Sequence, residues 1–520
     1  MTDIEDETKV TTVDAEMSPI KSSIKASEVD VGELISYDDI DPALEAKMHL
    51  VNNAINQLGF TTYHWKLFCL SGFGSGLLYA ADSLVAFLYS ITVGQVVFEY
   101  QPSYIRGGQL AFYVGALVGA LFWGISADII GRKWAFNISL LLTSIFGIIC
   151  GAADNWIGYC SLVCLTAFAC GGNLVLDTTV FLEFLPSNKQ WLVTLMAIWW
   201  GVGQTIAGLL AWAFIPNFSC ASADNCTRSN NMGWRYLFFT AGGLVLVMSL
   251  LRVTVLRFEE TPKFLVCQGR DEQVANLFQK LAKTYGRPID LTLEDLQRHG
   301  QVTSTHSRKR ASLSEIWVHY RGLFMTRKTG MSTTLVWFSW ALIGLAYPLF
   351  YFFLPDYLAS RGARFGETSA YITWRNYTLA QVCAIFGPLL AAYLCQFRRI
   401  GRKYTMLIGA MISMAFFFSY TAVRNNDENV AFNCVISFAT NIYYGTLYAY
   451  SPEVMPSAHR STGNGTAVAC NRIMGIMSAV VATYASPSTA APVYICAALF
   501  GVMGLVAVVF PFEPERAQSM

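Results

Sequence analysis

Gly124-Ile-Ser-Ala-Asp128-Ile-Ile-Gly131-Arg132-Lys133 is the stretch of sequence that decides the fold. It closes a long apolar segment with an acidic residue and then a tight basic turn. A Gly401-Arg402-Lys403 turn recurs 270 positions later (401 − 131), and the Glu183…Pro186 motif recurs at the same offset as Glu453…Pro456 (453 − 183 = 270). Two unrelated motifs in one register indicate a duplicated bundle of membrane helices.

The composition of the 520 residues supports a membrane protein, because 54% are hydrophobic and only 14% are charged. A soluble chain carries roughly 25% charged residues. The net charge of +1 argues against nucleic acid as a partner. Most of the thirteen Cys lie in apolar segments, and no Cys-x-x-Cys pair suggests a metal or redox site.

A membrane-spanning helix needs about 20 mostly apolar residues. The sequence predicts an all-α membrane fold with twelve such helices in two pseudo-symmetric six-helix bundles, at 67–91, 108–127, 134–152, 159–182, 192–214, 236–256, 331–355, 370–394, 404–422, 430–450, 465–484 and 491–511.

The basic residues of the short loops gather on one side of these helices, which predicts that side to be cytosolic. The expected parts are an acidic, largely disordered cytosolic tail (1–64), an N-terminal bundle (65–256), a cytosolic linker (257–330), a C-terminal bundle (331–511) and a short cytosolic tail (512–520). Within the linker, residues 272–283 and 291–299 have the pattern of short amphipathic helices.

The loop after the fifth helix offers an independent check of orientation. It holds two N-glycosylation acceptors, Asn217 and Asn225, together with Cys220 and Cys226. Glycans and disulfides form outside the cytosol, so this loop is predicted outside. The alternative is that such short acceptor motifs occur by accident.

The charged helix ends on the cytosolic side are candidates for a gate. Asp128 lies at the wrong helix end for the helix dipole and needs a positive partner, and a partner present in one conformation only would form a latch. The predicted gating residues are Asp128, Gly131, Arg132, Lys133, Glu183, Arg402 and Glu453. The alternatives are a charge cluster that only sets topology and prolines that only end helices.

The Gly-x-x-x-Asp-x-x-Gly-Arg-Lys string resembles the signature of the major facilitator superfamily. Ala81-Asp82, Gly171-Gly172-Asn173 and Gly203-Gln204 are among the strings that resemble its synaptic-vesicle-protein-like branch, which borders the sugar porters and includes nicotinate carriers. Glu260-Thr-Pro262 and Pro511-Phe-Glu513 resemble the sugar-porter Pro-Glu-Ser-Pro-Arg block and its C-terminal echo. The resemblance implies that Asp128 faces residues 463–465 at the start of helix eleven.

One departure from the family pattern concerns the second half. Arg398 occupies the position that matches Asp128, so only the first half carries the full signature. We therefore expect the two halves to contribute differently to the gate.

Ionisable residues inside a bilayer are costly and usually have a task. We expect Asp82 and Asp177 to carry protons, and Arg375 or Arg472 to hold a substrate anion. The alternative is a structural Asp–Arg pair between helices. Arg252, near a helix end, is expected to snorkel to the membrane surface.

Aromatic and amide side chains at helical spacing favour a planar or hydroxylated ligand. The predicted substrate-binding set is Arg375, Arg472, Asn173, Gln204, Trp340, Tyr347, Asn441 and Tyr444. Packing between helices is the competing explanation for these stripes, as it is the favoured one for Gly115-x-x-x-Gly119.

These observations predict a secondary active transporter rather than an enzyme. The expected substrate is a small monocarboxylate such as a nicotinate-like acid, moved by alternating access and driven by a proton gradient without a cofactor. Alternatives are a sugar or polyol symporter, an efflux transporter for a secondary metabolite, and a non-transporting nutrient sensor. We expect a monomer in the lipid bilayer, in the plasma membrane first and a vacuolar or vesicle membrane second.

Overall fold

The computed structural model describes residues 42–70, 76–256, 259–302, 313–360, 369–484 and 491–514. For some residues in these ranges the structure describes the backbone only. They are residues 69–70, 76–87, 174, 255–256, 313–315, 351–360 and 482–484. The described parts are helical, as predicted, and contain no strand.

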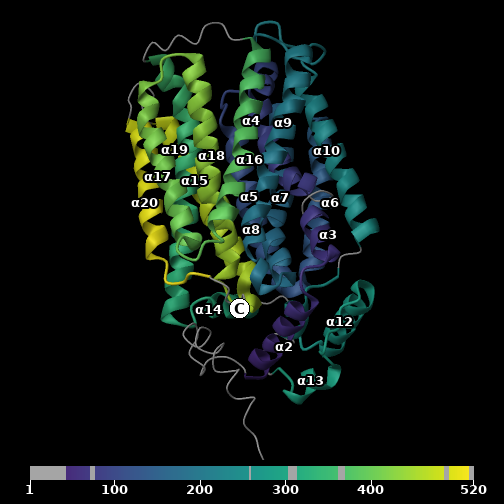
Figure 1. The fold of residues 1–520 in the computed structure, drawn as a ribbon. Helices are drawn as coiled ribbons and strands as arrows, with labels where there is room; N and C mark the ends of the chain where they lie inside the picture. The colour runs from purple at the N-terminus through teal and green to yellow at the C-terminus, as the bar shows by residue number, and fades with distance from the viewer. Residues whose placement is uncertain are drawn as a thin grey trace, which may run out of the picture. The chain divides into compact units, whose positions relative to one another are not determined.

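Long helices run side by side (Figure 1). In the first half these are α4 (Gly76–Tyr100), α5 (Gly107–Ile130), α6 (Arg132–Cys150), α7 (Trp156–Phe184), α9 (Ile198–Phe218, preceded by the short α8, Trp191–Met196) and α10 (Gly233–Leu251). In the second half they are α15 (Arg327–Ser360), α16 (Ala370–Leu394), α17 (Gly401–Ser419), α18 (Asn426–Glu453), α19 (Arg460–Tyr484) and α20 (Ala491–Val509).

The helix contacts show the same duplication that the 270-residue offset predicted. In the first half α5 and α6 both pack on α7, α4 packs on α9, and α10 packs on α6 and α4. The second half repeats each pairing with α16, α17, α18, α15, α19 and α20 in the corresponding roles. The contacts between halves are also symmetric, since α5 meets α19 and α9 meets α16. The two halves therefore share one topology.

Nine of the helices in the described ranges are long and apolar enough to cross a membrane. Of the three other long helices, α18 and α19 occupy the places predicted for the tenth and eleventh spans. The first span was predicted at 67–91, and α4 overlaps it but extends further, to Tyr100.

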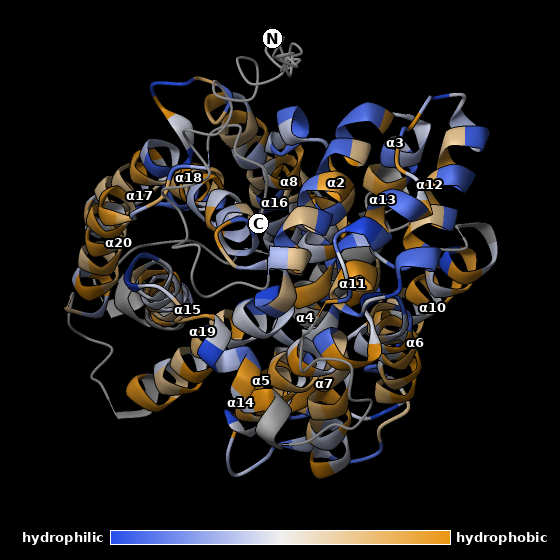
Figure 2. Cartoon of the chain, turned by 90° about the horizontal axis from the view of Figure 1, so that it is seen from below, coloured by the Kyte–Doolittle hydropathy of each residue, from blue (hydrophilic) through white to orange (hydrophobic). Residues whose placement is uncertain are grey.

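Shorter helices gather at one end of the bundle, which we call the linker end (Figures 1 and 2). They are α11 (Pro262–Cys267), α12 (Asp271–Tyr285), α13 (Leu293–Arg298) and α14 (Leu313–Gly322), joined there by α2 (Pro42–Leu58). The two amphipathic helices predicted within the linker are confirmed as α12 and α13.

The expectation of a largely disordered tail over residues 1–64 is wrong for its last part. Residues 42–58 form α2, which buries Val51, Ile55 and Leu58 against the linker helices, and α3 (Thr62–Leu70) follows. Lys47 of α2 is buried and pairs with Asp271 of α12 at 2.5 Å. The apolar positions of α2 recur at helical spacing, and this amphipathic pattern outweighs the acidic composition further upstream.

The expectation of close helix packing at Gly115 and Gly119 is confirmed. A Cβ added at either residue would collide with a backbone carbonyl of α7, that of Cys164 or of Phe168. The absence of side chains at these two positions is what lets α5 and α7 pack backbone to backbone.

Replacing Gly119 with alanine is expected to destabilise the protein by about 1–3 kcal/mol, because an overpacked helix contact must separate. Gly243→Ala in α10 is the matched control, since no described atom lies within 4 Å of its added Cβ. Thermal unfolding of the purified protein in detergent measures both. Equal midpoints for the two variants would contradict the packing role.

Candidate functional site

The linker end of the bundle holds a buried cluster of charges that joins the two halves. Asp128, in the last turn of α5, accepts hydrogen bonds from the backbone N–H and the hydroxyl of Thr462 at 2.8 and 2.9 Å. Thr462 lies in the first turn of α19, where unpaired backbone N–H groups and the helix dipole favour an anion. The resemblance placed Asp128 against this helix end, and the structure has it there.

Arg132, the first residue of α6, is the hub of this cluster. Its guanidinium donates to Glu183 at 2.5 Å and to the Ser457 carbonyl at 2.8 Å, and it lies 3.4 Å from Asp128. Arg460 of α19 reaches Glu183 from the other half at 3.2 Å. One carboxylate thus holds two arginines, one from each half.

A second arginine cluster occupies the symmetry-related position. Arg402 of α17 pairs with Glu453 of α18 at 2.5 Å. It also crosses to the first half, donating to the Thr194 hydroxyl at 2.5 Å and the Gln190 carbonyl at 3.3 Å. Each of the two glutamates, Glu183 and Glu453, therefore pairs with the arginine of the matching turn, and both arginines bridge the halves.

Two glutamates that were not among the predicted site residues hold the turns in place. Glu260 accepts from the backbone N–H groups of Arg132 and Lys133, and Glu513 does the same for Arg402 and Lys403. Each carboxylate therefore caps a helix N-terminus. Burial raises the pKa of Glu260, against the lowering effect of these hydrogen bonds.

The glycines of the two turns make room for these carboxylates. Gly131 and Gly401 have φ values of 105° and 56°, and an added Cβ would collide with Glu260 or Glu513 respectively. In the sequence, Glu260-Thr-Pro262 and Pro511-Phe-Glu513 were the two motifs that pointed to this arrangement.

Further from the linker end, aromatic side chains from three helices form a cluster. Trp200 of α9 lies 4.5 Å from Tyr444 and 4.6 Å from Tyr448 of α18, measured between ring centroids. Trp340 of α15 contacts Tyr444 at 5.4 Å, and its Nε1 donates to the Ser451 hydroxyl at 2.8 Å. Of the predicted set, Trp340 and Tyr444 therefore come together, and Trp200 joins them from the other half.

Arg472 lies beside this aromatic cluster. Its guanidinium interacts electrostatically with the hydroxyl groups of Tyr444 and of Tyr113 from α5. Its Nε is buried and has no hydrogen-bond partner among the described residues. Arg472 is 12 residues into α19 (472 − 460), or about 18 Å from the linker end at 1.5 Å per residue. This depth is close to the middle of a hydrocarbon core of about 30 Å.

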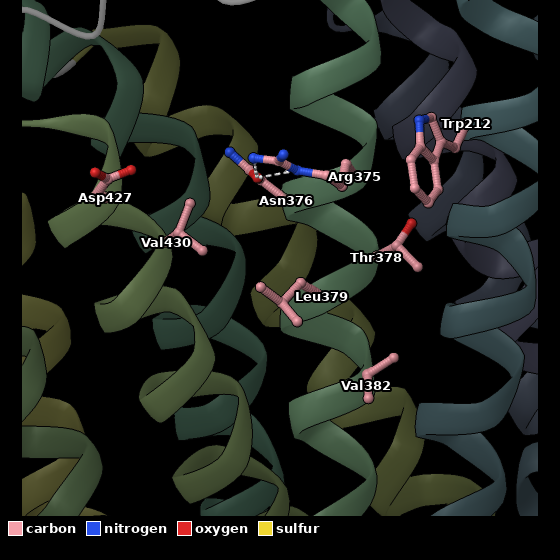
Figure 3. A pocket seen from close by; sticks show the side chains of 8 residues that line it. All are labelled: Trp212, Arg375, Asn376, Thr378, Leu379, Val382, Asp427 and Val430. Atoms are coloured by element: carbon pink, nitrogen blue, oxygen red, sulfur yellow. Dashed lines mark hydrogen bonds between the residues drawn. The ribbon is translucent and has the colours of Figure 1, made fainter.

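Arg375 occupies a different place. It is exposed near the far end of α16, 19 residues from the end of that helix at the linker end (394 − 375), or about 28 Å. Its guanidinium donates to the neighbouring Asn376 side chain. Arg375 lines a cavity of about 400 Å³, and Arg472 is not in its lining, which is Trp212, Arg375, Asn376, Thr378, Leu379, Val382, Asp427 and Val430 (Figure 3). The two candidate anion-binding arginines are therefore separate.

The other predicted binding residues are distributed over both bundles. Asn173 is buried and accepts from the Ser139 hydroxyl at 2.8 Å, inside the first bundle. Asn441 donates to the Ser437 carbonyl of its own helix at 2.8 Å. Gln204 of α9 and Tyr347 of α15 are partly buried.

Of the two acidic residues expected to carry protons, the structure describes the side chain of Asp177. Asp177 of α7 is buried 4.0 Å from Arg252. The expectation that Arg252 snorkels is wrong, because its guanidinium is buried and stacks on the Phe136 ring at 3.0 Å. The aromatic face stabilises the cation where it lies. Asp82 falls among the side chains outside the description.

The loop after α9 carries the predicted surface features. Cys220 and Cys226 form a disulfide, and both Asn217 and Asn225 are exposed. Asn217 lies in the last turn of α9 and donates to the Ala213 carbonyl. No group of three or more His, Cys, Asp or Glu that could hold a metal ion occurs in the described ranges.

Comparison with known proteins connects this geometry to a family. The family model described as "Sugar (and other) transporter" matches residues 66–518. The chain is 39% identical to the MFS siderochrome iron transporter 1 of Ceriporiopsis subvermispora, over 98% of this chain and 99% of the relative. It is 26% identical to the niacin transporter NiaP of Acinetobacter baylyi, over 84% and 90%, and 24% identical to the synaptic vesicle 2-related protein of Xenopus laevis, over 90% and 81%.

The fold has counterparts among solved structures. The proton:xylose symporter XylE of E. coli, bound to 6-bromo-6-deoxy-D-glucose, superposes with a TM-score of 0.62 at 17% identity, covering 88% of this chain and 98% of that one. The predicted superfamily and its synaptic-vesicle and sugar-porter neighbourhood are confirmed. The protein is a multi-pass membrane transporter rather than an enzyme, and transporters of this kind need no cofactor. The chain belongs to the sugar (and other) transporter family of the major facilitator superfamily.

Proposed function

We propose that this transporter carries a small aromatic monocarboxylate, such as a nicotinate-like acid, together with protons. The observation that carries the proposal is the buried Nε of Arg472 at mid-depth, which has no hydrogen-bond partner among the described residues and whose charge acts on Tyr113 of the first half and Tyr444 of the second. A guanidinium binds a carboxylate through charge-assisted hydrogen bonds. The cluster of Trp200, Trp340 and Tyr444 offers ring faces on which a planar ring can stack.

The gate cluster completes an alternating-access cycle in this proposal. Bonds at the predicted cytosolic side join the halves in this structure. In the proposed cycle these bonds keep that side closed, and the gating residues are Asp128, Gly131, Arg132, Lys133, Glu183, Arg402 and Glu453. Rocking of the two bundles would break these bonds and open the central site to the cytosol. The niacin transporter among the relatives supports the carboxylate, and a sugar or polyol is the second candidate because of the XylE-like fold.

Uptake into proteoliposomes made with the purified protein tests the substrate. With acid outside, we expect nicotinate to accumulate, benzoate to compete with it and xylose to leave it unchanged. A protonophore should abolish the accumulation. Uptake of xylose without nicotinate would favour the sugar symporter, and release of solute from cells without uptake would favour the efflux transporter.

If Asp177 carries a proton, its replacement should affect gradient-driven accumulation and substrate exchange differently. Asp177→Asn should lose accumulation driven by the proton gradient but retain exchange of labelled for unlabelled nicotinate, because exchange moves no net proton. Asp82→Asn is expected to behave in the same way. Asp154→Asn is the control, since its carboxylate is exposed and pairs with Arg228 at the surface. Loss of both activities in Asp177→Asn, with Asp177→Glu equally inactive, would instead indicate the structural pair with Arg252.

Two further features are proposed on the sequence alone. The protein resides in the plasma membrane as a monomer, and Asn217 and Asn225 carry glycans on the outer side. Glycosidase treatment of the wild type and of the Asn225→Gln variant checks the second of these, by the change in electrophoretic mobility.

A further inference from the structure

A pair of buried histidines joins the linker to the gate. The Nδ1 atoms of His319, in α14, and of His459, in the short turn at 457–459, lie 2.9 Å apart. Both side chains are buried, and their rings meet edge to face with centroids 5.0 Å apart. Gly322 completes the contact, because an added Cβ at that position would collide with the His459 ring. The Tyr320 hydroxyl adds a 3.0 Å hydrogen bond to Thr466 of α19.

The turn that carries His459 is itself part of the gate. The Ser457 carbonyl accepts from Arg132 at 2.8 Å, and Arg460, the next residue along the chain, donates to Glu183 at 3.2 Å. A helix of the linker therefore docks on the segment through which the second half is held to the first. Release of α14 would remove a packing partner of this segment.

The geometry of the pair restricts its protonation. Two Nδ1 atoms at 2.9 Å share one hydrogen between them, so at least one ring must present a lone pair. If both rings are protonated, two N–H donors and two positive charges face each other in a buried site, which is strongly unfavourable. The docked arrangement thus accepts fewer protons than two separated, solvated histidines.

The surroundings of the pair add to this restriction. Among the side chains that the structure describes, the titratable and charged groups near the pair are Tyr320 and Arg321 of α14, Lys263 and Cys267 of α11, Arg460 of α19, Arg132 of α6, Asp128 of α5 and Glu183 of α7. The side chain of Glu315, also in α14, lies outside the described residues. Asp128 and Glu183 already hold Arg132 and Arg460. Burial, with help from Arg460, lowers the pKa of Lys263 to about 7, which shows how poorly this region accommodates another cation.

We propose that the His319–His459 pair is a pH-sensitive latch that holds α14 on the closed gate and releases it when the linker side becomes acidic. The docked state binds fewer protons than the released state. Docking therefore loses stability as the pH falls. The latch requires no particular substrate, so it stands or falls separately from the proposed transport activity.

Hydrogen exchange of the full-length protein in detergent, without substrate, tests the latch. The peptide that covers α14 is followed by mass spectrometry at pH 7.5, 6.5 and 5.5, with each rate corrected for intrinsic exchange chemistry. We expect protection of α14 in the wild type to fall between pH 6.5 and 5.5, by up to about tenfold per proton taken up. The peptide covering α12, which has no histidine, is the internal reference.

Variants separate titration from packing. Gln can share a hydrogen bond but does not titrate, so His319→Gln with His459→Gln should keep α14 protected and remove the pH dependence. His299→Gln, at an exposed position in the linker, should leave the wild-type profile unchanged. Gly322→Ala should lower protection at every pH. A wild-type profile without pH dependence, or a pH dependence that persists in the double glutamine variant, would overturn the latch.

Discussion

Replacing Arg472 with glutamine is expected to raise the KM for nicotinate uptake by roughly a hundredfold. A charge-assisted hydrogen bond to a buried group contributes about 1.5–3 kcal/mol, and each 1.4 kcal/mol is a factor of ten in affinity. The effect should be large because the Arg472 Nε has no described protein partner that would compete with a bound carboxylate. Initial rates of labelled nicotinate uptake in proteoliposomes measure it.

Arg375→Gln is the matched control for this prediction. It removes the same charge about 10 Å further along the bundle by helix rise, at an exposed position, so we expect a change of threefold or less. An equal rise in KM in the two variants would contradict the assignment of substrate binding to Arg472 alone. An Arg472→Gln protein that takes up nicotinate with the wild-type KM would refute the binding role of Arg472.

Glu183→Gln is expected to weaken the proposed gate by about 3–5 kcal/mol, because it leaves two buried guanidinium groups without their shared carboxylate. That energy corresponds to a shift of more than a hundredfold toward the open gate. Native Cys267 of α11 is a convenient reporter, since burial raises the pKa of its thiol to about 12 in the closed gate. Its labelling by a soluble maleimide, quantified by peptide mass spectrometry, should rise at least tenfold.

Glu259→Gln provides the control for the gate. Glu259 pairs with Lys280 at the exposed surface of the linker, where an ion pair contributes 1 kcal/mol or less. Its labelling rate at Cys267 should match that of the wild type. Equal rates in Glu183→Gln and the wild type would show that this carboxylate does not hold the halves together.

The charge cluster at the linker end was the part of the site that the sequence predicted best. Asp128, Arg132 and Glu183 stand in short motifs, and the 270-residue repeat showed that Arg402 and Glu453 would occupy matching positions. A charged residue at a helix end can contact only the helix ends on the same side of the bundle, so its partners follow from the topology. The helices themselves could be predicted from hydropathy, because a chain that crosses lipid must satisfy its own backbone hydrogen bonds.

The partners across the interface were harder to predict. Thr462, Arg460 and Ser457 lie more than 270 residues from the side chains that they contact, and no local pattern relates them. Glu260 and Glu513 were noticed only as parts of a family block, whereas the structure shows that each caps a helix.

Orientation within uniformly apolar helices was the main limit. Arg252 was expected at the membrane surface, but the Phe136 ring gives it a buried partner. Arg375 and Arg472 looked equivalent in sequence, and only the fold separates an exposed position from one beside the aromatic cluster. The amphipathic α2 was hidden because an acidic segment precedes it.

The most direct test of alternating access uses spin labels at positions 134 and 404, which are related by the same 270-residue offset. Trp134 and Tyr404 are 61% and 51% exposed near the gate ends of α6 and α17, one in each half. Pulsed dipolar spectroscopy then measures the distance between cysteine-linked labels there. We predict a short distance for the closed gate and a longer one whose population grows with nicotinate and in Glu183→Gln. A single distance that neither substrate nor variant changes would contradict the account.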